Sequence, residues 1–394
     1  MTGNWTAIVI NYNGAGFIEA CIQALESCAT RPSEIIVVDN GSSDDSLLEM
    51  HAFPRAQVIA QGRNLGFAGG ANAGLEAVET DYAVVFNPDV EVDPSFGTNL
   101  IEAFTNNPRL AAAGALLLYP DGETVQHAGG IVERPLLTTR HHAYGERLDS
   151  LNLVERPVDF VTGGAMALRM EAVREVGGFD DTLSPVYYED VDLCLRLRDH
   201  HWEVKFVPLL RALHHEGVTL QRSAVYYHYL HRNRITFALK HLSATEWSTQ
   251  FVPAEIARMR NELQHLEHEE WLTVTGANAI EGLLRSATAW EATPLLQSAG
   301  FDAARHALEE TRNLWEVTGK PSGSRVSFAG TLRNLVNSLG PRQALDAALT
   351  EQRAFNAAVV RTLEAQDRLH REQLAETLLI ALDVLYRERE HSIS

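Results

Sequence analysis

The chain has 394 residues, a length that favours two domains over one compact unit. Apolar residues make up 45% of it, enough for a core, and charged residues make up 22%, which argues against wholesale disorder. With 33 basic and 52 acidic residues the net charge is −19. Most of the surface therefore repels nucleic acid and anionic lipid, and we expect no nucleic-acid partner, although a local cation for a phosphate is compatible with this charge.

The three cysteines, Cys21, Cys28 and Cys194, show neither paired spacing nor a Cys-x-x-Cys motif. They predict small buried side chains in a reducing compartment, with no disulfide framework and no zinc site. The first ten residues enter a strand-like run without the features of a signal peptide, and the longest mostly apolar stretch, Leu110 to Tyr119, is about half of a membrane span. The expected location is the cytoplasm, with a membrane-bound acceptor at the inner face left open.

Short apolar runs alternate with helical patterns through the first 240 residues. Strands are predicted at Ala7–Asn11, Ile35–Val38, Val58–Ala60, Tyr82–Phe86 and Val204–Val207. Helices are predicted around Ile18 to Leu25, at Gly69–Val78 and at Asp190–Arg198. Residues 127–157 read as loop-rich, and apolar structure resumes from Val158 to Met170. This alternation predicts an α/β fold built from βαβ units around a mainly parallel sheet.

Polar side chains follow three of these strands, at the edge where open α/β sheets bind ligands. They are Asn11-Tyr12-Asn13, Asp39-Asn40 and Asn87-Pro88-Asp89. A carboxylate at Asp39 can accept hydrogen bonds from a base or ribose, and Asp89 can hold Mg²⁺ or Mn²⁺ against a diphosphate. Any one of these sets is equally typical of a turn. Three at consecutive strand ends favour a nucleotide-sugar site.

Four further segments each allow a functional and a purely structural interpretation. The small residues from Gly66 to Gly74 permit close approach of a ligand or form a tight helix entry. Glu189, Asp190 and Asp192 include a general base or merely complement the helix dipole. His214 is a metal ligand or a surface residue. The run Arg232-Asn233-Arg234 binds phosphate or covers a solvated helix face.

Taken in chain order, these segments resemble glycosyltransferase family 2, and within it the bacterial rhamnosyltransferase-like members. The resemblance covers roughly residues 5–242. The matching pieces are Ile8–Asn13, Val37–Asp44, Asn64–Asn72, Asn87-Pro88-Asp89, Gly163-Gly164-Ala165, Gly177–Asp180, Tyr188–Arg196, His214 and Arg232-Asn233. Each piece is moderately specific, and the ordered set is strongly specific.

The resemblance implies a GT-A fold, a Rossmann-like, mixed and mostly parallel sheet with helices on both faces. It implies that Asp190 is the catalytic base of an inverting transfer, and that Asp89 and His214 hold Mn²⁺ or Mg²⁺. The acceptor would meet Gly163, Gly164 and Glu189. The nucleotide sugar would meet Asn11, Asp39, Asn64, Gly69, Asn72, Asn87 and Asp89.

The donor and the acceptor are predicted less sharply. Asn87 replaces the first acid of an Asp-x-Asp-type motif, a pattern similar to the subgroup that uses deoxythymidine diphosphate rhamnose, so this donor ranks before a uridine diphosphate hexose. The acceptor is a saccharide, a lipid-linked sugar or another hydroxyl compound, in keeping with cell-surface polysaccharide synthesis.

Two other functions compete with this interpretation. A nucleotidyltransferase would carry a basic Gly-rich loop after the first strand, but residues 11–16 contain no Lys or Arg. A catalytically inactive sugar-nucleotide-binding or scaffold protein would not need Asp89, Asp190 and His214 together.

The composition changes near residue 245, so we expect a catalytic domain over residues 1–245 and an all-α domain over 246–394. The last segment, Gln352 to Arg389, carries two apolar stripes separated by a polar stretch. The stripes either bury an ordinary helical core or form a two-fold homodimer interface, and the region has either an oligomerisation or an acceptor role.

Overall fold

The computed structural model describes residues 4–215, 224–255 and 257–258. The chain divides into two units, Met1–His241 and Leu242–Ser394. In the second unit the described residues form α8 (Ala244–Glu246), a π-helical turn (Trp247–Phe251) and the helical residues that follow. The amphipathic segment Gln352 to Arg389 lies outside the described residues.

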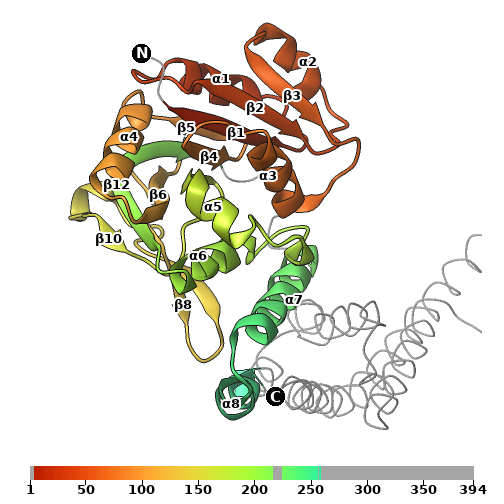
Figure 1. The fold of residues 1–394 in the computed structure, drawn as a ribbon, viewed down its shortest axis with the longest axis vertical. Coiled ribbons are helices and arrows are strands. Elements are labelled where there is room, and N and C mark those ends of the chain that lie inside the picture. Colours follow the sequence, from red (N-terminus) through yellow and green to blue (C-terminus); the bar gives the residue numbers. More distant parts are fainter. Residues whose placement is uncertain (1–3, 216–223, 256, 259–394) are drawn as a thin grey trace, which may run out of the picture. The chain divides into compact units, whose positions relative to one another are not determined.

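A ten-stranded mixed sheet forms the centre of the first unit (Figure 1). Its strand order is β10-β12-β6-β11-β4-β1-β2-β3, with β5 beside β12 and β7 beside β6. The strands are β1 (Trp5–Asn11), β2 (Glu34–Asp39), β3 (Ala56–Ala60), β4 (Tyr82–Phe86), β5 (Val90–Val92), β6 (Leu110–Leu118), β7 (Val125–His127), β10 (Arg156–Pro157), β11 (Ala165–Arg169) and β12 (Glu203–His214).

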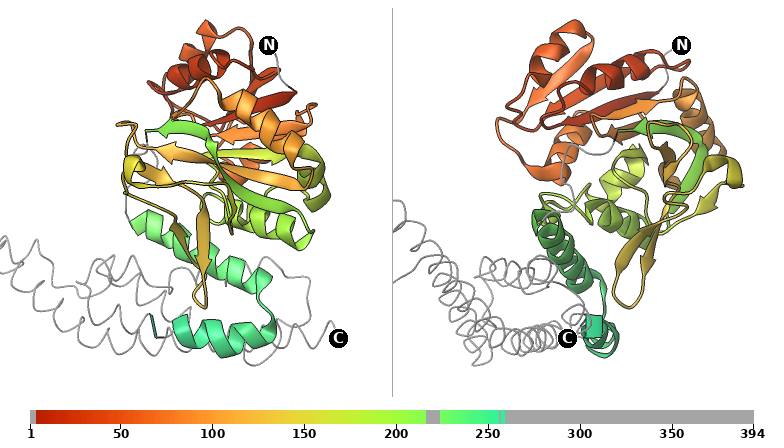
Figure 2. Two further views of the ribbon diagram at one scale, coloured as in Figure 1. Left: turned by 90° about the vertical axis from the view of Figure 1, so that its left-hand side faces the viewer. Right: turned by 180° about the vertical axis from the view of Figure 1, so that it is seen from behind.

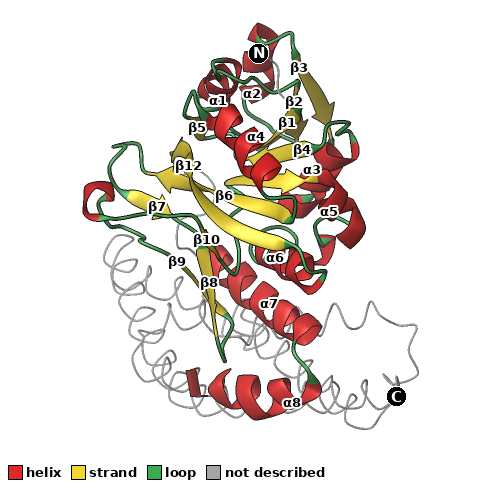
Figure 3. Ribbon diagram, turned by 60° about the vertical axis from the view of Figure 1, so that its left-hand side comes forward, coloured by secondary structure: helices red, strands yellow, loops and turns green. Residues whose placement is uncertain are grey.

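Strand direction divides this sheet into two parts. β1 to β4 run parallel to one another, and β12 runs parallel to β6. Between the two groups lies β11, antiparallel to both β4 and β6. The long strands β6 and β12 lie side by side in Figure 3. The sheet is therefore mixed with most strands in one direction, and the predicted α/β, GT-A-like arrangement is confirmed.

Helices cover both faces of the sheet, because alternate residues of each buried strand point to opposite sides. Ala7, Val9 and Val37 pack in one core with α1 (Ile18–Glu26) and α4 (Phe96–Asn106). On the other face, Ile8 and Val38 lie against α3 (Gly66–Glu76). The remaining helices are α2 (Ser46–Glu49), α5 (Met170–Val176), α6 (Glu189–Asp199) and α7 (Ala224–His241), with short 3₁₀ turns at Met50–Ala52, Leu148–Ser150 and Asp181–Leu183.

The structure departs from the sequence prediction in several elements. The region predicted as loop-rich contains a β-hairpin, β8 (Gly130–Glu133) and β9 (Thr138–His141), which projects from the main sheet (Figure 2). The glycine-rich segment predicted to precede a helix is itself the start of α3, which begins at Gly66. β12 is longer than predicted and continues to His214. Among the described residues, no helix is long and apolar enough to cross a membrane.

Candidate active site

The carboxyl ends of β1 and β2 form a rigid polar corner. Asn11 is fully buried, and its Nδ2 donates to Asp39 Oδ1 at 3.1 Å, to Ser42 Oγ at 3.0 Å and to Ser46 Oγ at 2.9 Å. The other oxygen of Asp39 accepts from the amides of Gly41 and Ser42 at 3.2 and 3.3 Å. Asn11 Oδ1 is buried and has no hydrogen-bond partner within the described part of the chain. The corner thus presents a fixed carboxylate and an acceptor for a ligand donor.

The loop before α3 is held against this corner by Asn40. Its Nδ2 donates to Gly66 O at 2.8 Å, and its Oδ1 accepts from the amide of Leu65 at 3.1 Å. Asn64 is exposed, and its Oδ1 accepts from the amide of Gly66 at 2.8 Å. Gly66 has φ of 77°, in the left-handed region that favours glycine, and a Cβ there would lie 2.8 Å from the backbone of Pro185. The predicted nucleotide segment therefore touches the loop that leads to α6.

Two predicted nucleotide residues on α3 are engaged in packing. The Asn72 amide donates to Phe179 O at 2.9 Å and to Asp181 Oδ1 at 3.0 Å, and Asn72 Oδ1 accepts from the Phe179 amide. Gly69 lies against Leu65. The structure thus shows Asn72 joining α3 to the 179–181 loop.

Asp89 and His214 are brought together from different strands. Asp89 follows β4, His214 ends β12, and Asp89 Oδ1 lies 3.2 Å from His214 Nε2. Asn87 Nδ2 lies 3.3 Å from the same ring nitrogen. Both side chains are largely buried, that of Asp89 being 9% exposed and that of His214 12% exposed. The sequence resemblance therefore placed two residues together that are separated by 125 positions in the chain.

This donor set fits a divalent cation. His214 Nδ1 faces the carbonyl oxygen of Gln126 at 2.6 Å, which accepts a hydrogen bond from Nδ1–H, so that in the neutral ring the lone pair lies on Nε2 and faces Asp89. An imidazole nitrogen and a carboxylate oxygen 3.2 Å apart are both electron-rich, and a shared cation relieves their repulsion. No cluster of three or more His, Cys, Asp or Glu side chains suited to a metal occurs in the described ranges. Two protein ligands agree with Mg²⁺-type sites, which take further ligands from substrate phosphates and water.

Asp190 lies in the first turn of α6 and faces the predicted acceptor loop. Its Oδ2 accepts from the amide of Gly163 at 3.2 Å, and its Oδ1 accepts from the amide of Val191 at 2.8 Å. Removal from water raises the pKa of Asp190 to about 6, against the lowering effect of these backbone hydrogen bonds. A carboxylate with such a pKa can take a proton near neutral pH.

Glu189 lies beside Asp190 and is only 7% exposed. Burial, and then the neighbouring Asp190 charge, raise the pKa of Glu189 well above its ordinary value and so favour its neutral form. Its Oε2 is buried without a hydrogen-bond partner in the residues that the structure describes. The surroundings of Glu189 therefore disfavour a second negative charge next to Asp190.

The Gly163-Gly164 pair connects the two halves of the site. Gly163 donates to Asp190, and Gly164 O accepts from the Asn87 amide at 3.1 Å. A Cβ at Gly164 would lie 3.5 Å from the His214 ring, and a Cβ at Gly163 would lie 2.5 Å from Phe67 Cζ. Both glycines therefore allow backbone and side chains to meet closely at one place.

The segment before α6 has an unusual backbone conformation. Tyr187 and Tyr188 have φ of 78° and 72°, which costs energy for residues with a side chain. Asn233 of α7 holds this segment by donating to Val186 O and Tyr187 O at 2.8 and 2.9 Å, and also to Leu183 O. Tyr188 is buried, and its hydroxyl donates to Leu137 O at 2.7 Å.

Several residues in this arrangement were not singled out by sequence reasoning. Gln126 and Ser46 lie outside the matching segments, and Ser42 lies within Val37–Asp44 but was given no role. Their partners at the site, His214 for Gln126 and Asn11 for both serines, lie 31 to 88 positions away. The arginines on α7, which were read as phosphate ligands or a solvated face, instead bind main-chain oxygens: Arg232 donates to Ser184 O and Arg234 to Leu136 O.

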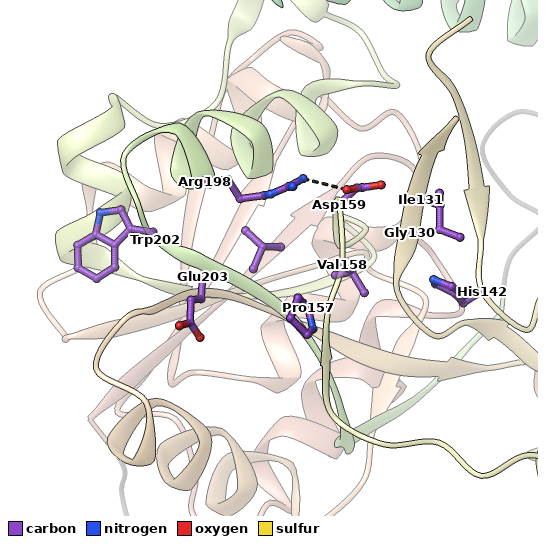
Figure 4. A pocket seen from close by; sticks show the side chains of 10 residues that line it. Gly130, Ile131, His142, Pro157, Val158, Asp159, Arg198, Trp202 and Glu203 are labelled. Atoms are coloured by element: carbon purple, nitrogen blue, oxygen red, sulfur yellow. Dashed lines mark hydrogen bonds and ion pairs between the residues drawn. The ribbon is translucent and has the colours of Figure 1, made fainter. Parts of the chain in front are cut away.

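A separate cavity of about 310 Å³ lies near the start of β12 (Figure 4). The Asp159–Arg198 ion pair borders it, with 2.9 Å between Oδ1 and Nη1. Glu203 and Val204 at the beginning of β12 also line it, whereas His214 ends the same strand. The cavity is therefore distinct from the Asp89–His214 pair.

Comparison with known proteins identifies the family. Residues 6–177 match the family model described as "Glycosyl transferase family 2". The chain is 29% identical over 239 residues to the N-acetylglucosaminyl-diphospho-decaprenol L-rhamnosyltransferase of Mycobacterium tuberculosis, covering 55% of this chain and 78% of the relative. It is 26% identical over 236 residues to the low-salt glycan biosynthesis hexosyltransferase Agl10 of Haloferax volcanii, covering 56% and 70%.

Solved glycosyltransferases are also similar, but more distantly. The structure of S. aureus TarS 1-349 in complex with UDP-GlcNAc aligns with 15% identity and a TM-score of 0.47, covering 72% of this chain and 81% of that one. The mannosyltransferase PcManGT of Pyrobaculum calidifontis aligns with 14% identity and a TM-score of 0.46, covering 74% and 81%. Similarity of this degree transfers neither ligand nor metal to the present chain. The family match and the curated relatives decide the matter: residues 6–177 belong to glycosyl transferase family 2, and the chain is a glycosyltransferase.

Proposed function

We propose that the chain transfers a sugar from a nucleotide diphosphate to an acceptor hydroxyl with inversion, using a divalent cation. The observation that carries this proposal is the convergence of Asp89, His214 and Asp190 around the Gly163-Gly164 pair. The cation would be held by Asp89 and His214 and would balance negative charge on the diphosphate.

The protein residues divide the work of the reaction. Asp39 and Asn11 bind the nucleoside, because the carboxylate is fixed by three hydrogen bonds and Asn11 offers an acceptor oxygen. Asp190 accepts the proton of the attacking hydroxyl. A single in-line displacement opposite the diphosphate inverts the anomeric carbon. Glu189, whose surroundings favour the neutral carboxyl, would donate a hydrogen bond to the acceptor in that form.

Rhamnose from deoxythymidine diphosphate rhamnose is the preferred donor, and a uridine diphosphate hexose is the second choice. Asn87-Pro88-Asp89 supports this order, as does similarity to a relative named as an L-rhamnosyltransferase. That relative's name contains a lipid-linked diphospho sugar, which favours such an acceptor here. The proposal includes action in the cytoplasm at the inner membrane face, a catalytic domain over residues 1–245, and a helical remainder that dimerises or assists the acceptor.

The test is nucleotide release from both donors by the full chain, with Mn²⁺, with Mg²⁺ and with EDTA. We expect release only with metal, faster from the deoxythymidine donor. His214→Ala and Asp89→Asn should abolish it. His215→Ala is the matched control, since His215 Nε2 binds Glu91 Oε1 at 2.6 Å and not Asp89. Full activity in EDTA would refute the cation, and a preference for the uridine donor would reverse the donor order.

A further inference from the structure

Gln126 is a buried amide that reaches the Asp89–His214 pair from a separate strand. It lies on β7, is 4% exposed, and its Oε1 is 2.6 Å from His214 Nδ1, although 88 positions separate the two residues. The sequence patterns gave no reason to select it. Nothing in the family comparison assigns it a role.

The local backbone explains why the side chain points to this histidine. β7 pairs antiparallel with β6, with Leu117 opposite His127 and Leu118 opposite Val125. Two consecutive residues of β6 therefore face two residues of β7 that flank Gln126, so Gln126 is an extra residue in its strand. Such a β-bulge locally bends a strand and redirects a side chain, and bulges are frequent next to active sites.

The hydrogen bond has a chemical consequence for His214. A carbonyl oxygen can only accept, so Nδ1 carries a proton, and of the two neutral tautomers this selects the one whose Nε2 lone pair faces Asp89. Without this acceptor the ring could carry its proton on Nε2, which would turn a hydrogen toward Asp89 in place of a lone pair. The ring could also rotate about its side-chain bonds.

We propose that Gln126 is the positioning residue that orients His214 and sets its tautomer for cation binding. This inference rests on the proposed function, because it assumes that His214 is a ligand. An outer partner of a metal-binding histidine typically changes metal affinity by about 10- to 100-fold when it is removed. Gln126 itself touches neither the cation nor the sugar.

The experiment measures Mn²⁺ affinity of the full chain by electron paramagnetic resonance of free Mn²⁺, in the presence of deoxythymidine diphosphate. Gln126→Leu should weaken Mn²⁺ binding by about 10- to 100-fold. Gln126→Glu should restore it, because a carboxylate also accepts from Nδ1–H. In transfer assays the Gln126→Leu defect should appear in the Mn²⁺ concentration needed for half-maximal rate, with kcat recovered at high Mn²⁺.

Glu91→Leu is the matched control. It deletes an acceptor at the same 2.6 Å distance, but from His215, the residue next to His214. Its Mn²⁺ affinity should stay close to that of the unmodified chain, and circular dichroism should show all three variants folded.

Each outcome has one meaning. If the unmodified chain binds no Mn²⁺, both the proposed cation dependence and this inference are refuted. If the unmodified chain binds Mn²⁺ and Gln126→Leu binds it equally well, the proposed function stands and the role of Gln126 is refuted. If Gln126→Glu is as weak as Gln126→Leu, or if Glu91→Leu is equally weak, the effect is general destabilisation and the inference is again refuted.

Discussion

Two of the three acidic residues in the first turn of α6, Asp190 and Asp192, have surroundings that shift their pKa values in opposite directions. Asp190 faces Gly163 at the site, and removal from water raises its pKa to about 6. Asp192 is fully buried on the side that faces α7. Burial alone would raise its pKa as well, but the hydrogen bond from His241 and the charges of Arg196 and Lys240 lower it to about 2.

Because of this difference, Asp190 is suited to proton transfer and Asp192 to holding two helices together, although both lie in one helical turn. A carboxylate surrounded by cations is a poor base but a strong connection between α6 and α7. A carboxylate without a nearby cation destabilises the folded chain slightly when it is ionised, but it can take a proton at neutral pH. Groups with pKa values driven apart in this way are a general indication of acid–base roles.

The largest expected effect comes from Asp190→Asn. Loss of a general base should lower the transfer rate by about 10²-fold or more, while nucleotide binding stays nearly intact. The melting temperature should stay the same or rise, because a neutral amide removes an unfavourable buried charge. Steady-state kinetics, calorimetry with nucleotide diphosphate and thermal unfolding measure the three quantities. Transfer at nearly the original rate would remove Asp190 from the mechanism.

Asp192→Asn should have the opposite profile. Removing one partner from a buried charged cluster typically costs about 3–5 kcal/mol of unfolding free energy. Because the folded pKa of Asp192 is about 2 against an ordinary value of 3.8, its contribution is complete above pH 4 and is lost as the pH falls from there towards 2. The free energies of unfolding of the unmodified chain and of Asp192→Asn, measured with denaturant, should differ less at pH 3 than at pH 7. Equal stability at pH 7 would contradict the assignment.

The pH dependence of transfer should report Asp190 directly. A base with pKa of about 6 is ionised above that pH, so kcat/KM should rise with pH through about 6 and then become constant. By pH 5 the value should be about tenfold below the plateau. The profile is measured at saturating Mn²⁺, over a range in which the chain remains folded. A constant rate down to pH 5 would show that Asp190 has an ordinary pKa and that its surroundings do not tune it.

The smallest effect is expected from Glu189→Gln. Burial and the Asp190 charge favour the neutral form of Glu189, so a neutral amide of similar shape should not move the pH midpoint of transfer, and any change should appear in the KM of the acceptor. If Glu189 were ionised, its removal would relieve repulsion of the Asp190 charge and shift the midpoint to lower pH. Comparison of the two pH profiles distinguishes these cases.

Local sequence patterns predicted the elements that need no distant partner to be recognised. β4 was predicted at its observed bounds, Tyr82–Phe86, because an apolar run is enclosed by polar residues on both sides. β8 and β9 were missed because they pair with each other across a short turn and carry little apolar pattern: β8 has Ile131 and Val132, and the four residues of β9 are all polar. β6 was noticed only as a long apolar stretch, since such a run does not show which strands it joins.

The residues of the site also fall into those that sequence motifs predicted and those that depend on contacts between distant segments. Family motifs selected Asp89, His214 and Asp190, whose juxtaposition the structure shows through the glycine pair. The motifs did not reveal Gln126 or Asn233's contacts, because these depend on a bulge and on the course of α7. Nor did they reveal that Asp190 and Asp192 differ in pKa, which follows from the contacts of His241 and Lys240 with Asp192 together with the charge of Arg196 on α6.

The left-handed backbone at Tyr187 and Tyr188 has a consequence for the order in which parts of the site can fold during synthesis. These two conformations are unfavourable by themselves, and the bonds that hold them come from Leu137 on one side and Asn233 on the other. Asn233 lies 46 positions after Tyr187, beyond the whole of β12. A nascent chain therefore cannot fix the start of α6 until the ribosome has released α7. Asp190, the proposed base, acquires its orientation late in synthesis, after the polar corner of β1 and β2 can already have formed.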